Sequence, residues 1–211
     1  MTERNKDHTE GATVGEDVSG LLQAHLVNKS DRDEAELEMI ALAYNKHVYR
    51  SRRKKADAVW FTEEFIRKVH SDMFGTLWEW AGKYRTTETN IGVNWHQIPE
   101  QVARLVKDFE FWNSAESKMS VLEIAARLQN RLTRVHPFKN GNGRHARLLT
   151  DIFFHSQKHP LPEWPQLQRM PQGDEIRKRY IAAMKKADLE DYDGLIKFIE
   201  SFMERERAQG S

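Results

Sequence analysis

Apolar residues between Ser120 and Val135 repeat at spacings of three and four, which places them on one face of a helix. This stripe consists of Val121, Ile124, Ala125, Leu128, Leu132 and Val135. Other elements must cover so continuous a stripe, and we expect a central, buried helix. Similar periodicity predicts helices at about 30–50, 62–74, 98–112, 142–153, 173–187 and 192–206. The fold class is therefore predicted to be all-α, a helical bundle.

One stretch, residues 85–95, interrupts the helical period. It is rich in β-branched residues and contains Asn90-Ile91-Gly92, a sequence that favours a turn. We expect a short β-hairpin or an extended loop here. The preceding helix has clearer boundaries, because Thr62 is a suitable N-cap and Gly75 a suitable stop.

The composition excludes several kinds of site. The chain has no cysteine, which rules out disulfides, thiolate zinc sites and a cysteine nucleophile. Its formal net charge is only +1, so any anion site must be local, and we interpret the basic run 50–55 as a solvated helix end rather than a nucleic-acid contact. No apolar run is long enough to cross a bilayer, and residues 1–17 are polar, so we expect a soluble protein of the cytoplasm with a disordered tail and no membrane partner.

The segment 136–147 carries the residues most suited to chemistry. His136 precedes Pro137, which disfavours helical angles at the histidine and should leave its imidazole at a helix end, where it can take a proton near neutral pH. Gly141 and Gly143 permit positive φ and close backbone approach, so their N–H groups can form an anion nest at the next helix start.

Two arginines complete this segment. Arg144 and Arg147 share one face of the first turns of that helix, where the helix dipole disfavours cations, so an anion or a buried carboxylate should answer them. A base, an anion nest and two guanidiniums are the equipment of phosphoryl or nucleotidyl transfer. Any one of these residues alone also fits an ordinary glycine-rich helix entry with surface arginines and a core histidine. Neither a P-loop nor a dinucleotide fingerprint is present.

Residues 136–147, His-Pro-Phe-Lys-Asn-Gly-Asn-Gly-Arg-His-Ala-Arg, resemble the signature of the Fic family, His-x-Phe-x-(Asp/Glu)-Gly-Asn-Gly-Arg-x-x-Arg. The likeness continues upstream through 73–75 and 80–86. Residues 90–93 and 97–99 are most similar to a bacterial subgroup called mobile mystery protein B. The resemblance implies a Fic core at about 55–160, preceded by a helical extension at 18–54 and followed by C-terminal helices at 161–211.

By this resemblance the protein would move AMP from ATP, with Mg²⁺, to a Ser, Thr or Tyr hydroxyl of a target protein. His136 would be the general base, with Asn142 and Arg144 as the other catalytic residues. The resemblance assigns nucleotide binding to Phe138, Gly141, Asn142, Gly143, Arg144 and Arg147, with Phe138 also anchoring the loop in the core. The target would dock by main-chain pairing on a hairpin flap at 85–95.

The sequence departs from the signature at Asn140, where the family has a carboxylate that helps to bind Mg²⁺. An amide oxygen is a weaker ligand for this cation. Three alternatives follow: weak metal binding at Asn140, transfer of a different group or removal of AMP, or an inactive nucleotide-binding interaction module. A separate regulatory or antitoxin-like protein is a further expected partner.

Some Fic proteins are inhibited by a helix bearing (Ser/Thr)-x-x-x-Glu-(Gly/Asn), whose glutamate pairs with the second motif arginine. Residues 30–35, Ser-Asp-Arg-Asp-Glu-Ala, match this pattern except at the last position, so the resemblance makes Glu34 the candidate partner of Arg147. The alternative is an ordinary helix start with an acidic first turn.

Overall fold

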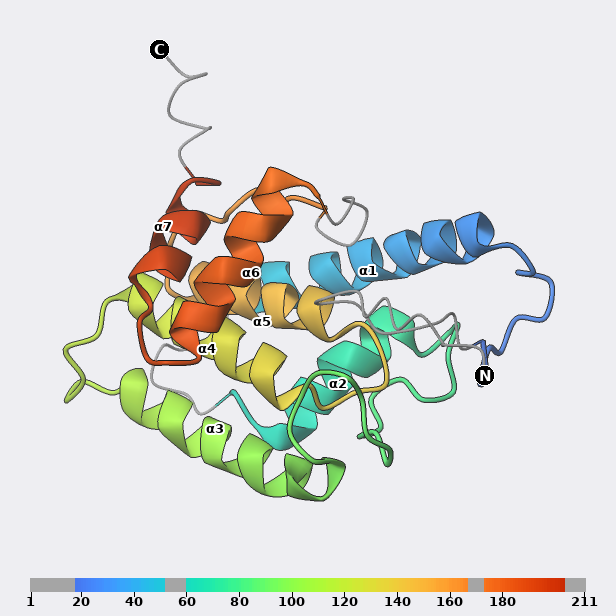
Figure 1. Ribbon diagram of the computed structural model, residues 1–211, viewed down its shortest axis with the longest axis horizontal. Coiled ribbons are helices and arrows are strands. Elements are labelled where there is room, and N and C mark those ends of the chain that lie inside the picture. The colour runs from blue at the N-terminus through green and yellow to red at the C-terminus, as the bar shows by residue number, and fades with distance from the viewer. Residues whose placement is uncertain (1–17, 52–59, 167–172, 204–211) are drawn as a thin grey trace, which may run out of the picture.

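The computed structural model describes residues 18–51, 60–166 and 173–203 (Figure 1). This part of the chain folds into a helical bundle, which confirms the all-α prediction. Its elements are α1 (Lys29–Ser51), α2 (Glu63–Phe74), the short 3-10 helix η1 (Trp95–Gln97), α3 (Ile98–Trp112), α4 (Val121–Val135), α5 (Asn142–Ser156), α6 (Glu175–Ala187) and α7 (Asp193–Glu200). The predicted tail 1–17, most of the basic run 50–55 and residues 204–206 lie outside the described residues.

Helix α4 lies at the centre of the bundle. It packs against α5, α3, α6 and α7, while α5 also contacts α1 and α2 (Figure 1). Its apolar stripe is buried as predicted from Ile124 to Val135, with Ala125 and Leu128 fully inaccessible to solvent, while Val121 is only partly buried. Burial of this stripe stabilises α4 and its packing against the neighbouring helices, among them α5, which follows α4 in the chain. The segment 136–141 that joins them is therefore held by the rigid middle of the protein.

The helix boundaries follow local chemistry. Thr62 Oγ1 accepts the N–H of Phe65 at 3.1 Å, and Ser120 Oγ accepts the N–H of Glu123 at 3.1 Å, which satisfies one free donor at the start of α2 and of α4. Helix α2 ends at Phe74 with Gly75 as its C-cap, as predicted. The last helix, α7, ends at Glu200, earlier than the predicted 206.

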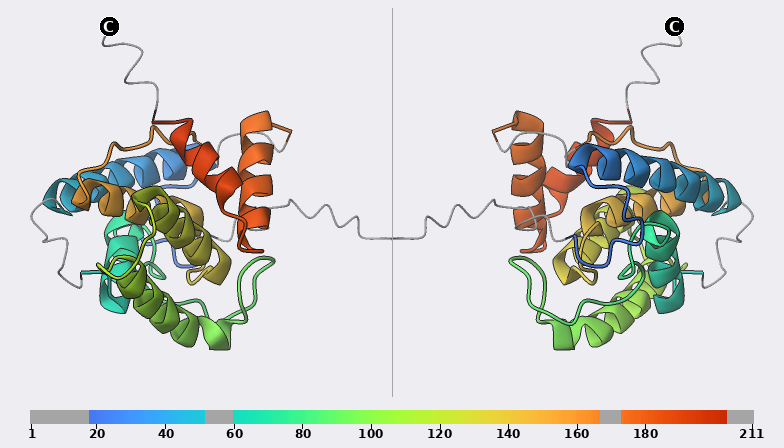
Figure 2. Two further views of the ribbon diagram at one scale, coloured as in Figure 1. Left: turned by 90° about the vertical axis from the view of Figure 1, so that its left-hand side faces the viewer. Right: turned by 90° about the vertical axis from the view of Figure 1, so that its right-hand side faces the viewer.

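The predicted β-hairpin at 85–95 is wrong. Among the described residues there is no strand, only an isolated antiparallel bridge between Leu21 and Trp78. The reason lies in the hydrogen-bonding partners, because the carbonyls of Thr87 and Val93 accept from the buried Arg85 side chain instead of from a facing strand. Residues 85–94 therefore form an irregular loop that leads into η1 and stands between α3 and the C-terminal helices in the left view of Figure 2.

No helix in the described ranges is both long and apolar enough to cross a membrane.

The helices α6 and α7 pack against each other, and both contact α4 (Figure 2).

Candidate functional site

The site is built on His136, the residue that ends α4. Its main chain is left-handed, with φ 52° and ψ 58°, and its N–H still donates to Leu132 O at 3.1 Å. A non-glycine residue in this region is strained by about 1–2 kcal/mol. Two hydrogen bonds from Arg85 offset this strain: Arg85 Nε donates to His136 O at 2.8 Å, and the Arg85 N–H donates to Pro137 O at 2.9 Å.

The imidazole of His136 is neutral and has one nitrogen free. Nδ1 lies 3.3 Å from the Thr133 carbonyl, which can only accept, so the ring proton is on Nδ1. Nε2 makes no hydrogen bond to any described residue and is not fully buried. Burial lowers the pKa of His136 to about 4, the Thr133 hydrogen bond opposes this shift, and the charge of Arg85 adds to it. His136 Nε2 therefore has the protonation state of a general base at neutral pH.

Asn142 closes the loop between the two helices. Its Oδ1 accepts the Phe138 N–H at 2.9 Å, and its Nδ2 donates to Phe138 O at 2.7 Å. Both ends of the buried amide are thus used within the loop. The side chain shapes the site, and the main-chain N–H of Asn142 is the group that the start of α5 presents to an anion.

Phe138 and two buried histidines fix the loop to the bundle. The Phe138 ring has no exposed surface and stacks on His70 with ring centres 3.7 Å apart, so it holds the loop and does not reach a nucleotide. His70 Nδ1 accepts the Gly82 N–H at 3.0 Å, and its Nε2–H donates to Asn140 O at 3.0 Å. His145 Nε2 lies 2.9 Å from Ile66 O. Burial lowers the pKa of both histidines, that of His145 to about 3.

The start of α5 has the backbone geometry of an anion nest. Gly141 is its N-cap with φ +75°, and an added Cβ there would lie 2.5 Å from the Phe74 ring, so only glycine fits. The first described hydrogen bond into the helix is His145 N to Gly141 O, at 2.9 Å. The N–H groups of residues 142–144 are therefore available to an anion, as the sequence predicts.

Asn140 is a poor metal ligand. Its Oδ1 accepts the N–H of Gly141 at 2.7 Å, so the amide oxygen is already used to shape the loop. In the ranges that the structure describes, no three Asp, Glu, His or Cys residues group as a cation site. A single, occupied amide oxygen does not fit a protein-held Mg²⁺, which prefers carboxylate and phosphate oxygens.

Arg144 is paired with a carboxylate from α1. Its Nη1 lies 2.5 Å from Glu36 Oε2, and its guanidinium lies over the Phe74 ring at 4.9 Å. The other oxygen, Glu36 Oε1, accepts the Trp78 Nε1–H at 2.7 Å. This ion pair confirms that a buried carboxylate answers one of the two motif arginines.

Glu34 does not make the contact that the resemblance suggests. It is exposed, whereas Glu36 is buried. Side chains that are two residues apart in a helix point in nearly opposite directions, so only one of these two glutamates can point into the bundle. The predicted pairing of Glu34 with Arg147 is therefore replaced by Glu36 with Arg144.

Arg147 is the second cation of the site. Its guanidinium is buried and lies next to the first turn of α5, with Nη1 3.6 Å from the position of a Cβ added to Gly143. Burial lowers its pKa, while Tyr180 of α6 and Asp151 oppose the shift. Gln129 Nε2 in turn donates to the Tyr180 hydroxyl at 3.1 Å. Both motif arginines are thus held near the start of α5.

The 85–95 loop lies directly against His136. Gly92 has φ +110°, and an added Cβ would lie 2.6 Å from His136 Cβ. The Val93 N–H also donates to Val135 O at 3.4 Å. The fold therefore brings the expected target-docking segment and the expected base together.

Three residues of the site, Glu36, His70 and Arg85, were not singled out from the sequence. Glu36 had a signal, because it lies four residues before Ile40 on the apolar face of α1, where a carboxylate needs a partner. No comparable local pattern marks His70 or Arg85. Their partners, Asn140 and His136, lie 70 and 51 residues away in the chain.

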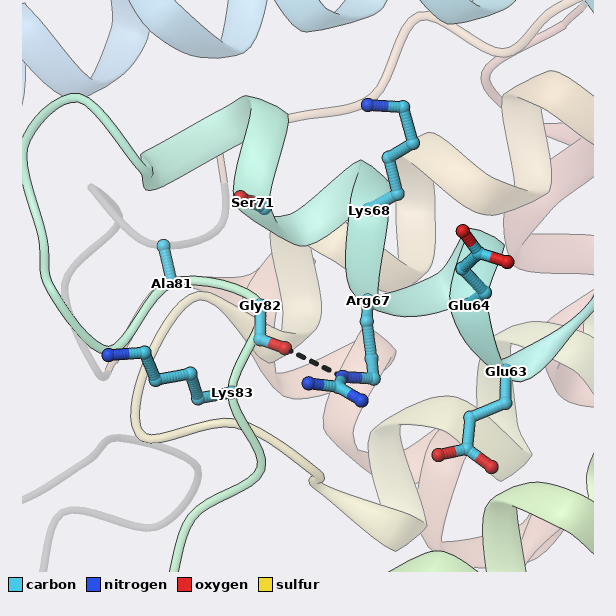
Figure 3. Close-up of a pocket in the computed structure, with 8 residues that line it drawn as sticks. All are labelled: Glu63, Glu64, Arg67, Lys68, Ser71, Ala81, Gly82 and Lys83. Carbon is cyan, nitrogen blue, oxygen red and sulfur yellow. Dashed lines mark hydrogen bonds between the residues drawn. The ribbon is translucent and has the colours of Figure 1, made fainter.

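A separate open cavity of about 620 Å³ lies beside α2 (Figure 3). At its edge Arg67 Nε donates to Gly82 O at 2.9 Å. The cavity contains none of the residues 136–147. It is lined by Glu63, Glu64, Arg67, Lys68, Ser71, Ala81, Gly82 and Lys83.

Comparison with known proteins places this geometry in a wider context. Residues 60–154 match the model of the Fic/DOC family. Protein adenylyltransferase fic-1 of Caenorhabditis elegans is 32% identical over 126 residues, which cover 59% of this chain and 23% of the relative. The chain thus spans about a quarter of the length of the curated relatives it matches.

Solved structures show the same fold. A Fic domain containing signaling protein from Bacteroides thetaiotaomicron superposes with a TM-score of 0.67 at 21% identity, covering 84% of this chain and 71% of that one. The N-terminal Fic domain of a putative cell filamentation protein from Bartonella quintana, solved with bound ADP, gives 0.53 at 19% identity, covering 80% and 85%. At these identities the likeness concerns the fold.

Proposed function

We propose that this chain, whose residues 60–154 match the Fic/DOC family model, belongs to that family and transfers AMP from ATP to a Ser, Thr or Tyr hydroxyl of a target protein. One observation carries the proposal. A neutral imidazole with a free Nε2 is separated by a short, rigid loop from three unpaired N–H groups and two guanidiniums. Support for the donor comes from a structural neighbour that holds ADP.

In the proposed reaction His136 Nε2 removes the proton from the target hydroxyl. The hydroxyl oxygen forms a bond to the α-phosphorus, and the bond from that phosphorus to the oxygen bridging to the β-phosphate breaks. Pyrophosphate leaves with the bonding electron pair. The N–H groups of residues 142–144 with Arg144 and Arg147 hold the phosphates and neutralise the charge that develops.

No step of this scheme uses a protein-held Mg²⁺. The resemblance implies the cation, but Asn140 replaces the usual carboxylate and its oxygen is occupied. Any Mg²⁺ would have to be bound chiefly by the oxygens of the nucleotide itself.

The target protein is proposed to dock on residues 85–95. Without a hairpin, the loop offers main-chain groups in an irregular arrangement, and Gly92 brings them against His136. We further propose a helical extension at 18–54, a Fic core at 55–160 and C-terminal helices at 161–211. The chain is proposed to belong to the mobile mystery protein B subgroup and to be controlled by a separate regulatory or antitoxin-like protein.

Labelled ATP tests the reaction. The purified protein is incubated with a host lysate and ATP labelled at either the α- or the γ-phosphate. Label transferred from the α position alone supports the proposal, and label from γ alone indicates phosphorylation. Absence of both, with nucleotide binding intact, indicates an interaction module or an enzyme that removes AMP, which release of AMP from a modified protein would identify.

A further inference from the structure

Arg85 connects three parts of the site through one buried guanidinium. Nε donates to His136 O at 2.8 Å, Nη1 donates to Thr87 O at 2.9 Å, and Nη2 donates to Val93 O. Thr87 and Val93 belong to the two limbs of the 85–95 loop, and His136 ends α4. The planar guanidinium is suited to such a fork, since its donors are fixed relative to one another.

The Arg85 main chain adds a fourth connection. Its N–H donates to Pro137 O at 2.9 Å, so side chain and main chain grip two successive carbonyls, those of His136 and Pro137. The direction of the His136 carbonyl is set by the left-handed angles of that residue. A hydrogen bond to a charged donor is stronger than a neutral one, and it favours the backbone conformation that presents the acceptor.

Gly92 shows how closely the loop fits this arrangement. A Cβ added to Gly92 would lie 2.6 Å from His136 Cβ and 2.7 Å from Arg85 Nη2. The loop, the guanidinium and the histidine thus meet with no room for a methyl group.

We propose that Arg85 is a positioning residue that sets the direction of the His136 imidazole relative to a target docked on the 85–95 loop. This inference rests on the proposed transfer reaction. A positive charge at position 85 is not sufficient for this role. A lysine ammonium is a single compact donor that cannot donate to both loop limbs and to His136 at once.

Arg85→Lys is the principal variant, and Arg67→Lys is its matched control. Arg67 also donates through Nε to a main-chain carbonyl, Gly82 O at 2.9 Å, in the segment that precedes the 85–95 loop. None of its described contacts reaches His136 or the loop itself. Both substitutions keep the charge. They differ in whether the loop is connected to the histidine.

Two measurements do not depend on catalysis. In Arg85→Lys, hydrogen exchange of the Val93 amide, which donates to Val135 O, is expected to accelerate about tenfold or more, because the loop has lost its buried donor. The His136 pKa, followed by NMR and assigned with His136→Gln, is expected to rise from about 4 toward its ordinary value as the ring gains solvent. Arg67→Lys should match the wild type in both.

The third measurement is transfer itself. Arg85→Lys should lower kcat about 10- to 100-fold while ATP binding changes less than about twofold, since misplacement of a base costs rate and not nucleotide affinity. If the wild type transfers nothing, the proposed function fails, but loop exchange and the His136 pKa still decide the role of Arg85.

Gly92→Ala provides a second route if Arg85→Lys does not fold. The added methyl separates the loop from His136 while keeping the guanidinium. It should produce the same increase in loop exchange and in the His136 pKa. The proposal is overturned if a folded variant of either kind leaves both quantities at their wild-type values.

Discussion

Glu36 Oε2 lies 2.5 Å from Arg144 Nη1, so a carboxylate of α1 occupies one of the two guanidiniums that we assign to nucleotide phosphates. The same carboxylate accepts a hydrogen bond from Trp78. A phosphate that binds Arg144 must compete with this intramolecular anion, and the competition sets the apparent nucleotide affinity.

Glu36→Gln should therefore increase ATP affinity about 3- to 10-fold. The amide keeps a group that can accept from Trp78 but removes the competing charge. Glu34→Gln is the matched control, since Glu34 is exposed on the same helix and should have no effect. Calorimetric titration with a non-hydrolysable ATP analogue measures both, and equal affinities in the two variants would show that Glu36 does not compete.

Transfer should tolerate acid better than an ordinary histidine base allows. The pKa of His136 is lowered to about 4, so the neutral, active form persists as the pH falls below 6.5 and is lost only near pH 4. We expect kcat/KM to stay level between about pH 7.5 and 5.5 on the His136 limb. A half-maximal rate near pH 6.5 would mean that the ring is solvated.

His136→Ala should abolish transfer while ATP still binds.

The stability of the fold should decrease on acidification. Burial lowers the pKa of His70 and His145 below the unfolded value of about 6.5, so the unfolded chain binds more protons at intermediate pH. Stability is therefore complete above pH 6.5 and is lost as the pH falls toward the folded pKa. At pH 5, keeping His145 neutral costs about 2 kcal/mol of stability. Urea unfolding at pH 7 and pH 5 measures the loss, which should be smaller in His145→Gln.

Gly141→Ala should destabilise the protein by about 2–4 kcal/mol. The methyl would meet the Phe74 ring at 2.5 Å, at a residue whose φ is +75°. Gly194→Ala is the control in α7, where the nearest atom is 3.8 Å away and alanine should stabilise the helix by about 0.5 kcal/mol. Thermal unfolding of the two variants should shift in opposite directions.

Asn140→Asp should make nucleotide binding respond to Mg²⁺. The carboxylate adds an oxygen with formal charge at the loop, and we expect the half-saturating Mg²⁺ concentration for ATP binding to fall about tenfold. Fluorescent ATP titrated at several Mg²⁺ concentrations tests this. An unchanged Mg²⁺ response would show that residue 140 only shapes the loop through the Gly141 N–H.

Much of this protein follows from local sequence alone. The period of the apolar residues determines where helices such as α4 form, because each face must be buried. Pro137 and Gly141 determine that α4 ends and α5 begins within a few residues, since proline and glycine restrict or release the backbone itself. The anion nest at the start of α5 was predictable for the same reason.

The tertiary structure decided which partners these groups have. Glu36 rather than Glu34 meets Arg144 because of how α1 rotates when it packs against α5, across 108 residues of sequence. Residues 85–95 form no hairpin because the buried Arg85 takes the carbonyls that a facing strand would use. A side chain's long-range partner depends on the mutual orientation of whole elements, which the packing of the core determines and local periodicity does not.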